Sequence, residues 1–418
     1  MASSNSKLAT IRRLPERPSV NGRISIEIPV AVPDLTGNEE KYILDAIRST
    51  WVSSTGEYVN RFERDFAELC GAQSAVSVSN GTVALHLAML ALDLRPGDEV
   101  LVPCLTYVAT ANAVRYVGGE PVFVDVDPDT WCIDPRKIEG SVTRRTKGII
   151  AVDLYGHPAD MDAINHLAAV RGLWVVEDAA EAHLAKYKRR TVGGLARLTT
   201  FSFYGNKIFT SGEGGALTLQ DPQLELRLRT LRGQGMDPER RYYFPVTGYN
   251  FRLTNLACAL LCAQLERRDE IIRRRRQIFE RYQSVLVGIP GISFQPVAQW
   301  AEPAPWLFSI VIKSKEYGRS RDELASKLAE KGIDTRPFFH PLHRLPPFRN
   351  ESRARRTKFP IGEQLGAEGL NLPTYPGMTD KQVDQIADAI RTSSRECAQI
   401  GRASRRPRSR SLVNSLPE

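Results

Sequence analysis

The sequence has no long apolar run and few residues that could fix disulfides or metals. No stretch of its 418 residues approaches the ~18 consecutive apolar residues of a membrane-spanning helix, which excludes an integral membrane protein. The six cysteines form no CxxC pair and no metal-ligand spacing. We therefore expect reduced, mostly buried thiols, no metal site and a cytoplasmic protein. Internal repeats and a secretory signal are also missing.

Acidic residues are scarce at both ends of the chain. Residues 1–23 hold five basic residues and one acid, and residues 391–418 hold seven basic residues and two acids. These ends carry the whole net charge of +9, so residues 24–390 are formally neutral. Because the ends are rich in Ser, Pro and Arg and lack periodic apolar residues, we predict mobile tails. Because residues 24–390 are formally neutral, we expect no nucleic-acid partner for the folded body.

Short β-branched runs alternate with helical patterns in the first half of the chain. Strands are expected at Ala75–Val78, Glu99–Val102, Pro121–Val124, Gly148–Val152 and Leu173–Val176, with helices at Thr82–Leu92, Thr110–Tyr116 and Met161–Arg171. This order is typical of βαβ units and predicts a mostly parallel sheet with helices on both faces. Ligands of such sheets bind at the carboxyl ends of the strands.

The pattern changes after residue 199. Two strands, Thr199–Phe203 and Gly215–Leu219, bracket a polar, Gly-rich loop, and one long helix is expected over Asn255–Gln283. A strand at Leu307–Ile312 and helices at Arg321–Lys331 and Asp380–Ile390 predict a small α/β domain. We divide the chain into a tail (1–23), a large domain (24–265), a long helix with the small domain (266–390) and a second tail (391–418).

Three motifs near strand ends carry the polar residues expected at a binding site. Ser77–Thr82 opens a helix, where Gly81 and Thr82 offer unpaired N–H groups to a phosphate, although an ordinary N-capped turn has the same pattern. Asp178 would suit a cationic ring nitrogen, and a capping acid fits its motif about as well. Lys207 lies among aromatic residues and glycines, where lost solvation depresses a lysine pKa as a Schiff base requires. The chain therefore carries a phosphate cradle, then a strand-end Asp, then a Ser-x4-Lys motif. This is the order of motifs required to hold pyridoxal 5′-phosphate (PLP).

From about Arg23 to Ile390 the sequence resembles the fold-type-I, PLP-dependent nucleotide-sugar aminotransferases of the aspartate-aminotransferase superfamily. The motifs that carry the resemblance are Pro33–Glu39, Ser79–Thr82, Glu177–His183, the Lys207 loop, Gly248–Thr254 and Arg336–His343. The resemblance implies an α/β fold, in which a large domain holds a mostly parallel seven-stranded sheet between helices and a small α/β domain follows. It also implies PLP as cofactor and a homodimer with shared active sites.

Carried over residue by residue, the resemblance implies two catalytic residues. Lys207 would bind the cofactor as a Schiff base and move the proton between substrate and cofactor, and Asp178 would keep the pyridine nitrogen protonated. The other implied cofactor contacts are Asn80, Gly81, Thr82, Tyr107, Glu181, Ser202 and Asn250, the last donated by the neighbouring subunit. The implied substrate contacts are His183, Arg252, Arg336 and His343.

The implied reaction moves an amino group from L-glutamate to the C4 ketone of a nucleotide-linked 4-keto-6-deoxyhexose, for polysaccharide or O-antigen biosynthesis. Phe203–Lys207 and Arg232–Pro238 most resemble the members that act on GDP-4-keto-6-deoxymannose. Leu184 and His340 replace the glycine and tyrosine common in the family on the substrate side, which leaves open a UDP- or dTDP-linked sugar and amination at C3.

Two other functions fit the sequence less well. A sugar 3-dehydratase of this family would carry histidine in place of Lys207. A PLP-fold regulator of nucleic acid would need a folded DNA-reading module, which tails of this length cannot supply.

Overall fold

The structure is a computed structural model that describes residues 26–349 and 357–403. The predicted tail at residues 1–23 lies outside the described residues, as does the second tail from residue 404 onward. None of the helices in the described part of the chain is long and apolar enough to cross a membrane.

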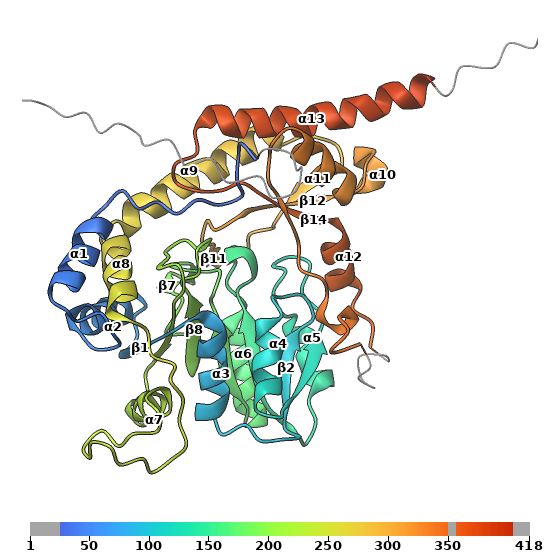
Figure 1. The fold of residues 1–418 in the computed structure, drawn as a ribbon. Helices are drawn as coiled ribbons and strands as arrows, with labels where there is room; N and C mark the ends of the chain where they lie inside the picture. The colour runs from blue at the N-terminus through green and yellow to red at the C-terminus, as the bar shows by residue number, and fades with distance from the viewer. Residues whose placement is uncertain (1–25, 350–356, 404–418) are drawn as a thin grey trace, which may run out of the picture.

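A seven-stranded sheet forms the centre of the larger part of the fold (Figure 1). Its order is β1-β9-β8-β5-β4-β2-β3, and its strands are β1 Ser74–Val78, β2 Glu99–Pro103, β3 Glu120–Val124, β4 Thr146–Val152, β5 Trp174–Asp178, β8 Leu198–Ser202 and β9 Gly215–Leu219. Neighbouring strands are parallel except in the two pairs that involve β9. The predicted mostly parallel, seven-stranded sheet is therefore confirmed.

Both faces of this sheet are buried, which explains why its strands are almost continuously apolar. In β2, Val100 and Val102 belong to one core cluster and Leu101 to another, because successive side chains point to opposite faces. Helices that pack against the sheet are α2 Glu57–Leu69, α3 Gly81–Ala91, α4 Ala109–Tyr116, α6 Met161–Arg171 and α7 Pro222–Arg232. Parallel pairing brings the carboxyl ends of β5 and β8 together, with Asp178 opposite Thr200.

A smaller antiparallel sheet has the order β10-β12-β14-β13 and follows in the second half of the chain. Its strands are β10 Ile292–Phe294, β12 Phe308–Ile312, β13 Arg336–Pro337 and β14 Gly369–Leu372. Helices α9 Arg268–Leu286, α11 Arg321–Glu330 and α13 Asp380–Ala403 share its core, and α9 and α13 run across the top of the molecule in Figure 1. This part is the predicted small α/β fold.

The remaining elements belong to neither of these two sheets. The helices are α1 Glu39–Arg48, α5 Pro135–Ile138, α8 Asn255–Glu266, α10 Ser314–Tyr317 and α12 Pro360–Glu368, with 3-10 turns at Glu139–Ser141, Leu154–Gly156 and Leu342–Arg344. Strands β6 Lys186–Tyr187, β7 Arg190–Thr191 and β11 Ala301–Glu302 form a third, three-stranded sheet.

The predicted single helix over Asn255–Gln283 is wrong, because α8 and α9 are separate helices that meet at Arg267. The Arg267 guanidinium makes two hydrogen bonds of 3.1 Å to the Asp34 carboxylate, and Asp269 and Glu270 begin a new helix N-terminus. The cores also differ on the two sides, since Leu265 belongs to the large core and Ile278 to the smaller one. We keep a domain boundary at residues 265 and 266 as a proposal.

The last helix is longer than the predicted Asp380–Ile390, and its extension corrects the start of the predicted tail at residue 391. Hydroxyl groups that lowered the expectation of helix are satisfied by the helix backbone, as when Ser393 donates to the Ala389 carbonyl at 2.8 Å. Arg391 also donates to the Val285 carbonyl of α9 at 2.8 Å. Residues 391 and 393 are therefore bonded within the helix and to α9.

Candidate active site

One cavity of about 390 Å³ opens at the carboxyl ends of the central strands and the start of α3. The predicted residues that line it are Asn80, Gly81, Thr82, Tyr107, Asp178, Glu181, Ser202 and Lys207. They come from segments up to 127 positions apart in the sequence, and the parallel sheet gathers them at one edge. The cavity therefore joins the three motifs that the sequence singled out.

The start of α3 forms a cradle of backbone N–H groups on one side of the cavity. The Asn80 side chain caps the helix by accepting a hydrogen bond from the Val83 N–H at 2.9 Å. Gly81 and Thr82 occupy the first turn, where N–H groups have no partner within the helix. A Cβ atom on Gly81 would lie 2.7 Å from the Ser202 Cβ, so only glycine lets this turn approach the end of β8. Such a turn suits a phosphate.

We predict that Gly215→Ala disturbs this cradle. The new Cβ would lie 2.5 Å from the Asn80 carbonyl carbon and 2.8 Å from the Gly81 nitrogen, so the start of α3 must shift. We expect a loss of about 1–3 kcal/mol in the free energy of unfolding, measured by denaturant titration, and weaker binding of a phosphorylated ligand. Gly205→Ala is the control, since its Cβ would meet only the Gly212 carbonyl oxygen at 3.9 Å. Equal stability of the two variants would contradict the prediction.

Asp178 supplies a buried carboxylate at the end of β5. Its Oδ2 accepts a hydrogen bond of 2.9 Å from the Thr110 hydroxyl, and its Oδ1 accepts one of 3.3 Å from the Ala180 N–H. Burial raises the pKa of this carboxyl, against the opposing effects of the Thr110 hydroxyl and the Lys207 charge. A cation placed beside Asp178 would favour its ionised form, so the cavity suits a positively charged ring nitrogen.

Lys207 lies opposite these groups, almost enclosed by the protein. Its Nζ is 3.7 Å from Glu181 Oε1 and 3.9 Å from the centroid of the Trp306 ring. Burial lowers the pKa of the Lys207 ammonium, while the carboxylates of Glu181 and Asp178 act in the opposite direction. Burial also raises the pKa of Glu181 to about 7. A partly desolvated amine beside a carboxyl group can act as nucleophile and can carry a proton.

We predict that Trp306→Leu makes Lys207 easier to deprotonate. The ring face favours the charged ammonium, so its loss lowers the pKa of Lys207 further. Because only the neutral amine attacks an aldehyde, the rate at which added PLP attaches to the protein should reach half its maximum at a lower pH. Trp306→Phe keeps a ring and should stay close to the parent. An unchanged pH profile in Trp306→Leu would refute this prediction.

Two predicted histidine contacts do not line the cavity. His183 is fully buried among the rings of Phe201, Phe203 and Phe209, and burial lowers its pKa to about 3. His343 is buried elsewhere, where its Nε2 lies 2.9 Å from Glu363 Oε1 and links Leu342–Arg344 to α12. Both side chains pack inside the protein and not against this cavity, and their roles as substrate contacts stay predictions.

The other predicted peripheral residues also lie outside the cavity wall. Arg336 is exposed and forms an ion pair with Asp334. Asn250 is exposed and pairs with Gly233, and Arg252 pairs with Val78 at the end of β1. The chain therefore does not place its own Arg336, Asn250 or Arg252 against the cavity.

A family model for aminotransferases matches residues 33–391, which include every residue that lines the cavity. The chain belongs to the DegT/DnrJ/EryC1/StrS aminotransferase family. It is similar to the GDP-perosamine synthase of Caulobacter vibrioides, with 44% identity over 87% of this chain and 97% of that enzyme. The GDP-perosamine synthase of Escherichia coli O157:H7 gives the same three values. The dTDP-3-amino-3,4,6-trideoxy-alpha-D-glucose transaminase of Streptomyces venezuelae is 38% identical over 80% of this chain and 87% of that enzyme.

Solved structures of the same kind share the fold. The crystal structure of DesV from S. venezuelae has a TM-score of 0.80 and 36% identity, covering 85% of this chain and 94% of DesV. The sugar aminotransferase Spr1654 of Streptococcus pneumoniae in its PLP form has a TM-score of 0.83 and 27% identity, covering 88% of this chain and 99% of that one. Members of this aminotransferase family depend on PLP, and this chain is a PLP-dependent aminotransferase.

The cavity of this family member fits PLP. It offers a cradle for the phosphate, a carboxylate for the ring nitrogen and a lysine for the aldehyde, on different sides of one space. The Oδ1 atom of Asn206 on the cavity wall is buried without a partner among the described residues, so it can accept a hydrogen bond from a bound molecule. Fold class, enzyme class and cofactor are thus as the sequence predicted.

Sequence reasoning missed Thr110, Trp306 and Phe339 of this aminotransferase. Thr110 holds Asp178, and Trp306 contacts Lys207 and donates from Nε1 to the Asn206 carbonyl at 2.8 Å. Trp306 follows a Pro-rich stretch with no strand or helix pattern, and no spacing links it to a lysine 99 positions earlier. The departure at Leu184 does have a structural counterpart, since its φ of 61° is the left-handed conformation that glycine favours.

Proposed function

We propose that the protein transfers an amino group from L-glutamate to the C4 ketone of GDP-4-keto-6-deoxymannose, giving GDP-perosamine. The observation that carries this proposal is the 44% identity to GDP-perosamine synthases along almost their whole length, in a chain whose cavity brings Lys207, Glu181 and Asp178 together. The product would serve polysaccharide or O-antigen biosynthesis, in the cytoplasm, where the free buried cysteines of the described residues are stable.

When bound, PLP supplies an electron sink for the pair left behind as a proton leaves the substrate carbon. Lys207 Nζ takes that proton and returns it, because it is the amine on the cavity wall that is desolvated beside a carboxyl group. Asp178 would hold its negative charge against the ring nitrogen, since Thr110 fixes the orientation of its carboxylate. Gly81, Thr82 and Ser202 would hold the phosphate, and Tyr107, which also lines the cavity, would contact the ring.

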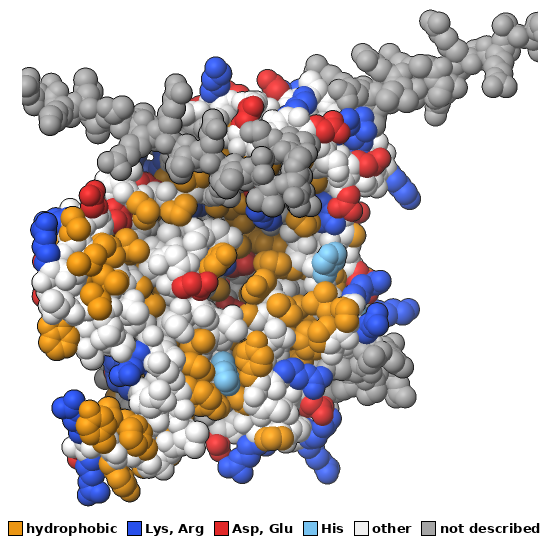
Figure 2. Space-filling model, viewed as in Figure 1, with side chains coloured by type: hydrophobic (Ala, Val, Ile, Leu, Met, Phe, Trp, Pro, Cys, Tyr) orange, Lys and Arg blue, Asp and Glu red, His pale blue; other side chains and the backbone are white. Residues whose placement is uncertain are grey.

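The assembly belongs to the proposal as well. Asn250 would reach the phosphate of a neighbouring subunit, which fits its exposure and its position away from the cavity of its own chain. Exposed apolar side chains gather over α1 with the residues just after it and over the segment after α7 (Figure 2), where they include Leu44, Ile47, Trp51, Tyr242, Tyr243 and Phe244. Apolar patches of this kind support a homodimer.

A dTDP- or UDP-linked keto sugar, aminated at C3 or C4, is the second candidate, which the 38% identity to the S. venezuelae transaminase favours. A 3-dehydratase is disfavoured because Lys207 lies in the cavity. The experiment that separates the candidates incubates the protein with PLP, glutamate and matched GDP-, UDP- and dTDP-4-keto-6-deoxy sugars. We expect the GDP sugar to gain an amine at C4, located by NMR, and faster turnover of a dTDP or UDP sugar would overturn this choice.

A further inference from the structure

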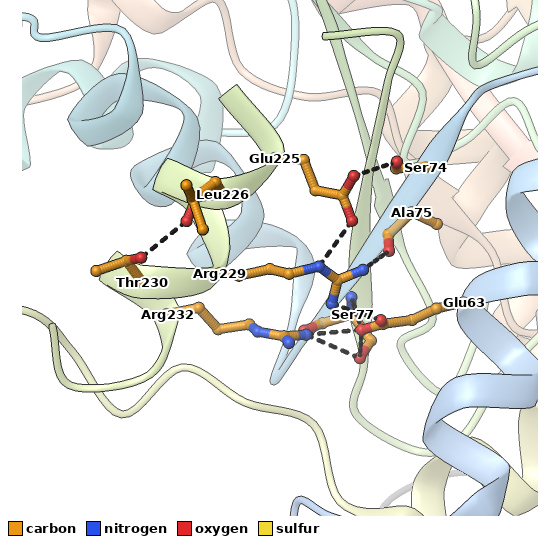
Figure 3. Close-up of polar contacts among 9 residues, drawn as sticks. All are labelled: Glu63, Ser74, Ala75, Ser77, Glu225, Leu226, Arg229, Thr230 and Arg232. Atoms are coloured by element: carbon orange, nitrogen blue, oxygen red, sulfur yellow. Dashed lines mark hydrogen bonds and ion pairs between the residues drawn. The ribbon is translucent and has the colours of Figure 1, made fainter. Parts of the chain in front are cut away.

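Two arginines share a buried carboxylate beside Ser77 of β1 (Figure 3). Glu63 of α2 is 7% exposed, and its Oε1 accepts hydrogen bonds of 2.7 Å from Arg232 Nη1, 2.7 Å from the Ser77 hydroxyl and 2.8 Å from the Ser77 N–H. Its Oε2 accepts one of 2.7 Å from Arg229 Nη1. Although burial acts to raise it, the charges of Arg232 and Arg229 hold the pKa of Glu63 below its ordinary value. The group is therefore a charged, hydrogen-bonded network that joins α2, β1 and α7. Arg232 takes part through Nη1, while its buried Nε has no partner among the described residues.

Arg232 differs from Arg229 in what else it holds. Arg232 Nη1 also donates to the Ser77 carbonyl at 2.7 Å, near the end of β1. The backbone carbonyl of Arg232 accepts a hydrogen bond from Phe251 N–H at 3.1 Å, and the Phe251 carbonyl accepts one from Ser79 N–H at 2.9 Å. These bonds close a ring that runs from the Arg232 backbone through Phe251 and Ser79 and back through Ser77 to the Arg232 side chain.

The ring includes the last residues of β1, immediately before the cradle. Asn80 and Gly81 follow Ser79 directly, so the position of Ser79 sets where the first N–H groups of α3 point. The segment that Phe251 belongs to also carries Asn250, which pairs with Gly233 next to Arg232. One side chain thus fastens both the cradle and the segment with the proposed contact to the neighbouring subunit.

We propose that Arg232 is a positioning residue for the cofactor phosphate, acting through the ring that it closes around the end of β1. The inference rests on the proposed position of the phosphate at the start of α3. An arginine fits this task because its charge-assisted hydrogen bonds to a carboxylate and a carbonyl are short and directional.

Arg229 provides a matched control within the same network. It bonds the other oxygen of Glu63, and its remaining partners are Glu225 at 2.8 Å and the Ala75 carbonyl at 3.1 Å, farther from the cradle. Removing either arginine leaves Glu63 with one cation fewer, so both variants lose stability for the same reason. Only the loss of Arg232 opens the ring.

The experiment compares Arg232→Met with Arg229→Met in the full-length protein. The dissociation constant for PLP and the ³¹P NMR signal of the bound phosphate are measured, with the unfolding midpoint without PLP. We expect similar midpoints, but PLP binding about tenfold weaker and a shifted ³¹P signal in Arg232→Met alone. Arg232→Gln and Arg229→Gln repeat the comparison and should give the same order if a Met variant does not fold.

Equal PLP affinities and equal ³¹P signals in the two variants would overturn the inference. Thr82→Pro tests the phosphate position separately, because it removes a backbone N–H of the cradle in the first turn of α3, where proline is tolerated, and leaves the ring intact. We expect weaker PLP binding in that variant too. Unchanged affinity and an unchanged ³¹P signal in that variant would show that the phosphate does not bind at the start of α3, which would overturn the inference. The proposed aminotransferase reaction is tested separately on the sugar panel.

Discussion

Replacing Lys207 by alanine is expected to lower the rate of amino transfer by about 10⁴-fold, because the variant loses both the nucleophile for the cofactor and the group that moves the proton. Lys207 is the one lysine among the cavity-lining residues. Glu181 and the Trp306 ring enclose its amine. The visible absorbance of the lysine-bound cofactor should also disappear. The measurement is single-turnover kinetics with glutamate, together with the absorption spectrum of the PLP-loaded protein.

Lys186→Ala is the matched control for this change. Lys186 is partly exposed, pairs with Glu302 at 3.1 Å and does not line the cavity. It should keep parental kinetics and the parental spectrum. Retention of the absorbance in Lys207→Ala would show that another amine binds the cofactor.

Replacing Asp178 by asparagine is expected to slow amino transfer by about 10²- to 10³-fold while the lysine-linked cofactor still forms. Asparagine keeps the size of the side chain and can still accept from the Thr110 hydroxyl, but it cannot hold a positive charge on the ring nitrogen. Rates with glutamate and the bound-cofactor spectrum, recorded on the same samples, separate lost chemistry from lost binding.

Glu177→Gln tests whether any buried carboxyl on this strand would have the same effect. Glu177 precedes Asp178 in β5 and points to the other side, where its Oε2 accepts from the Thr199 hydroxyl at 2.9 Å. Burial raises the pKa of Glu177 to about 7, so its carboxyl group is readily protonated. The neutral amide of glutamine therefore changes the charge at this position little. We expect near-parental rates. A loss as large as that of Asp178→Asn would show that the effect comes from burial rather than from the cavity.

The fold could be predicted from the sequence because its main signal is local. Strands buried on both faces need apolar runs, and helices that cover them need apolar residues at helical spacing, so the alternation from β1 to β5 is visible in the chain. The break between α8 and α9 could not be seen in the same way. It depends on the ion pair of Arg267 with Asp34, 233 positions away.

The candidate site divides along the same line. Gly81, Asp178 and Lys207 stand at strand or helix ends, and the parallel sheet fixes where such ends meet. His183 belongs to the same motif as Glu181, but its ring points into an aromatic core. The motif does not determine this direction, because the side chain of a turn residue can point either way. Trp306 reaches Lys207 because the segment before β12 packs into the large core, a contact that no local pattern records.

The most direct test of the account is to reduce the PLP-loaded protein with borohydride and to locate the attached pyridoxyl group by peptide mass spectrometry. The account predicts one labelled lysine, Lys207, in the peptide that follows β8. A label on a different lysine, or no label on protein that carries out amino transfer, would contradict it.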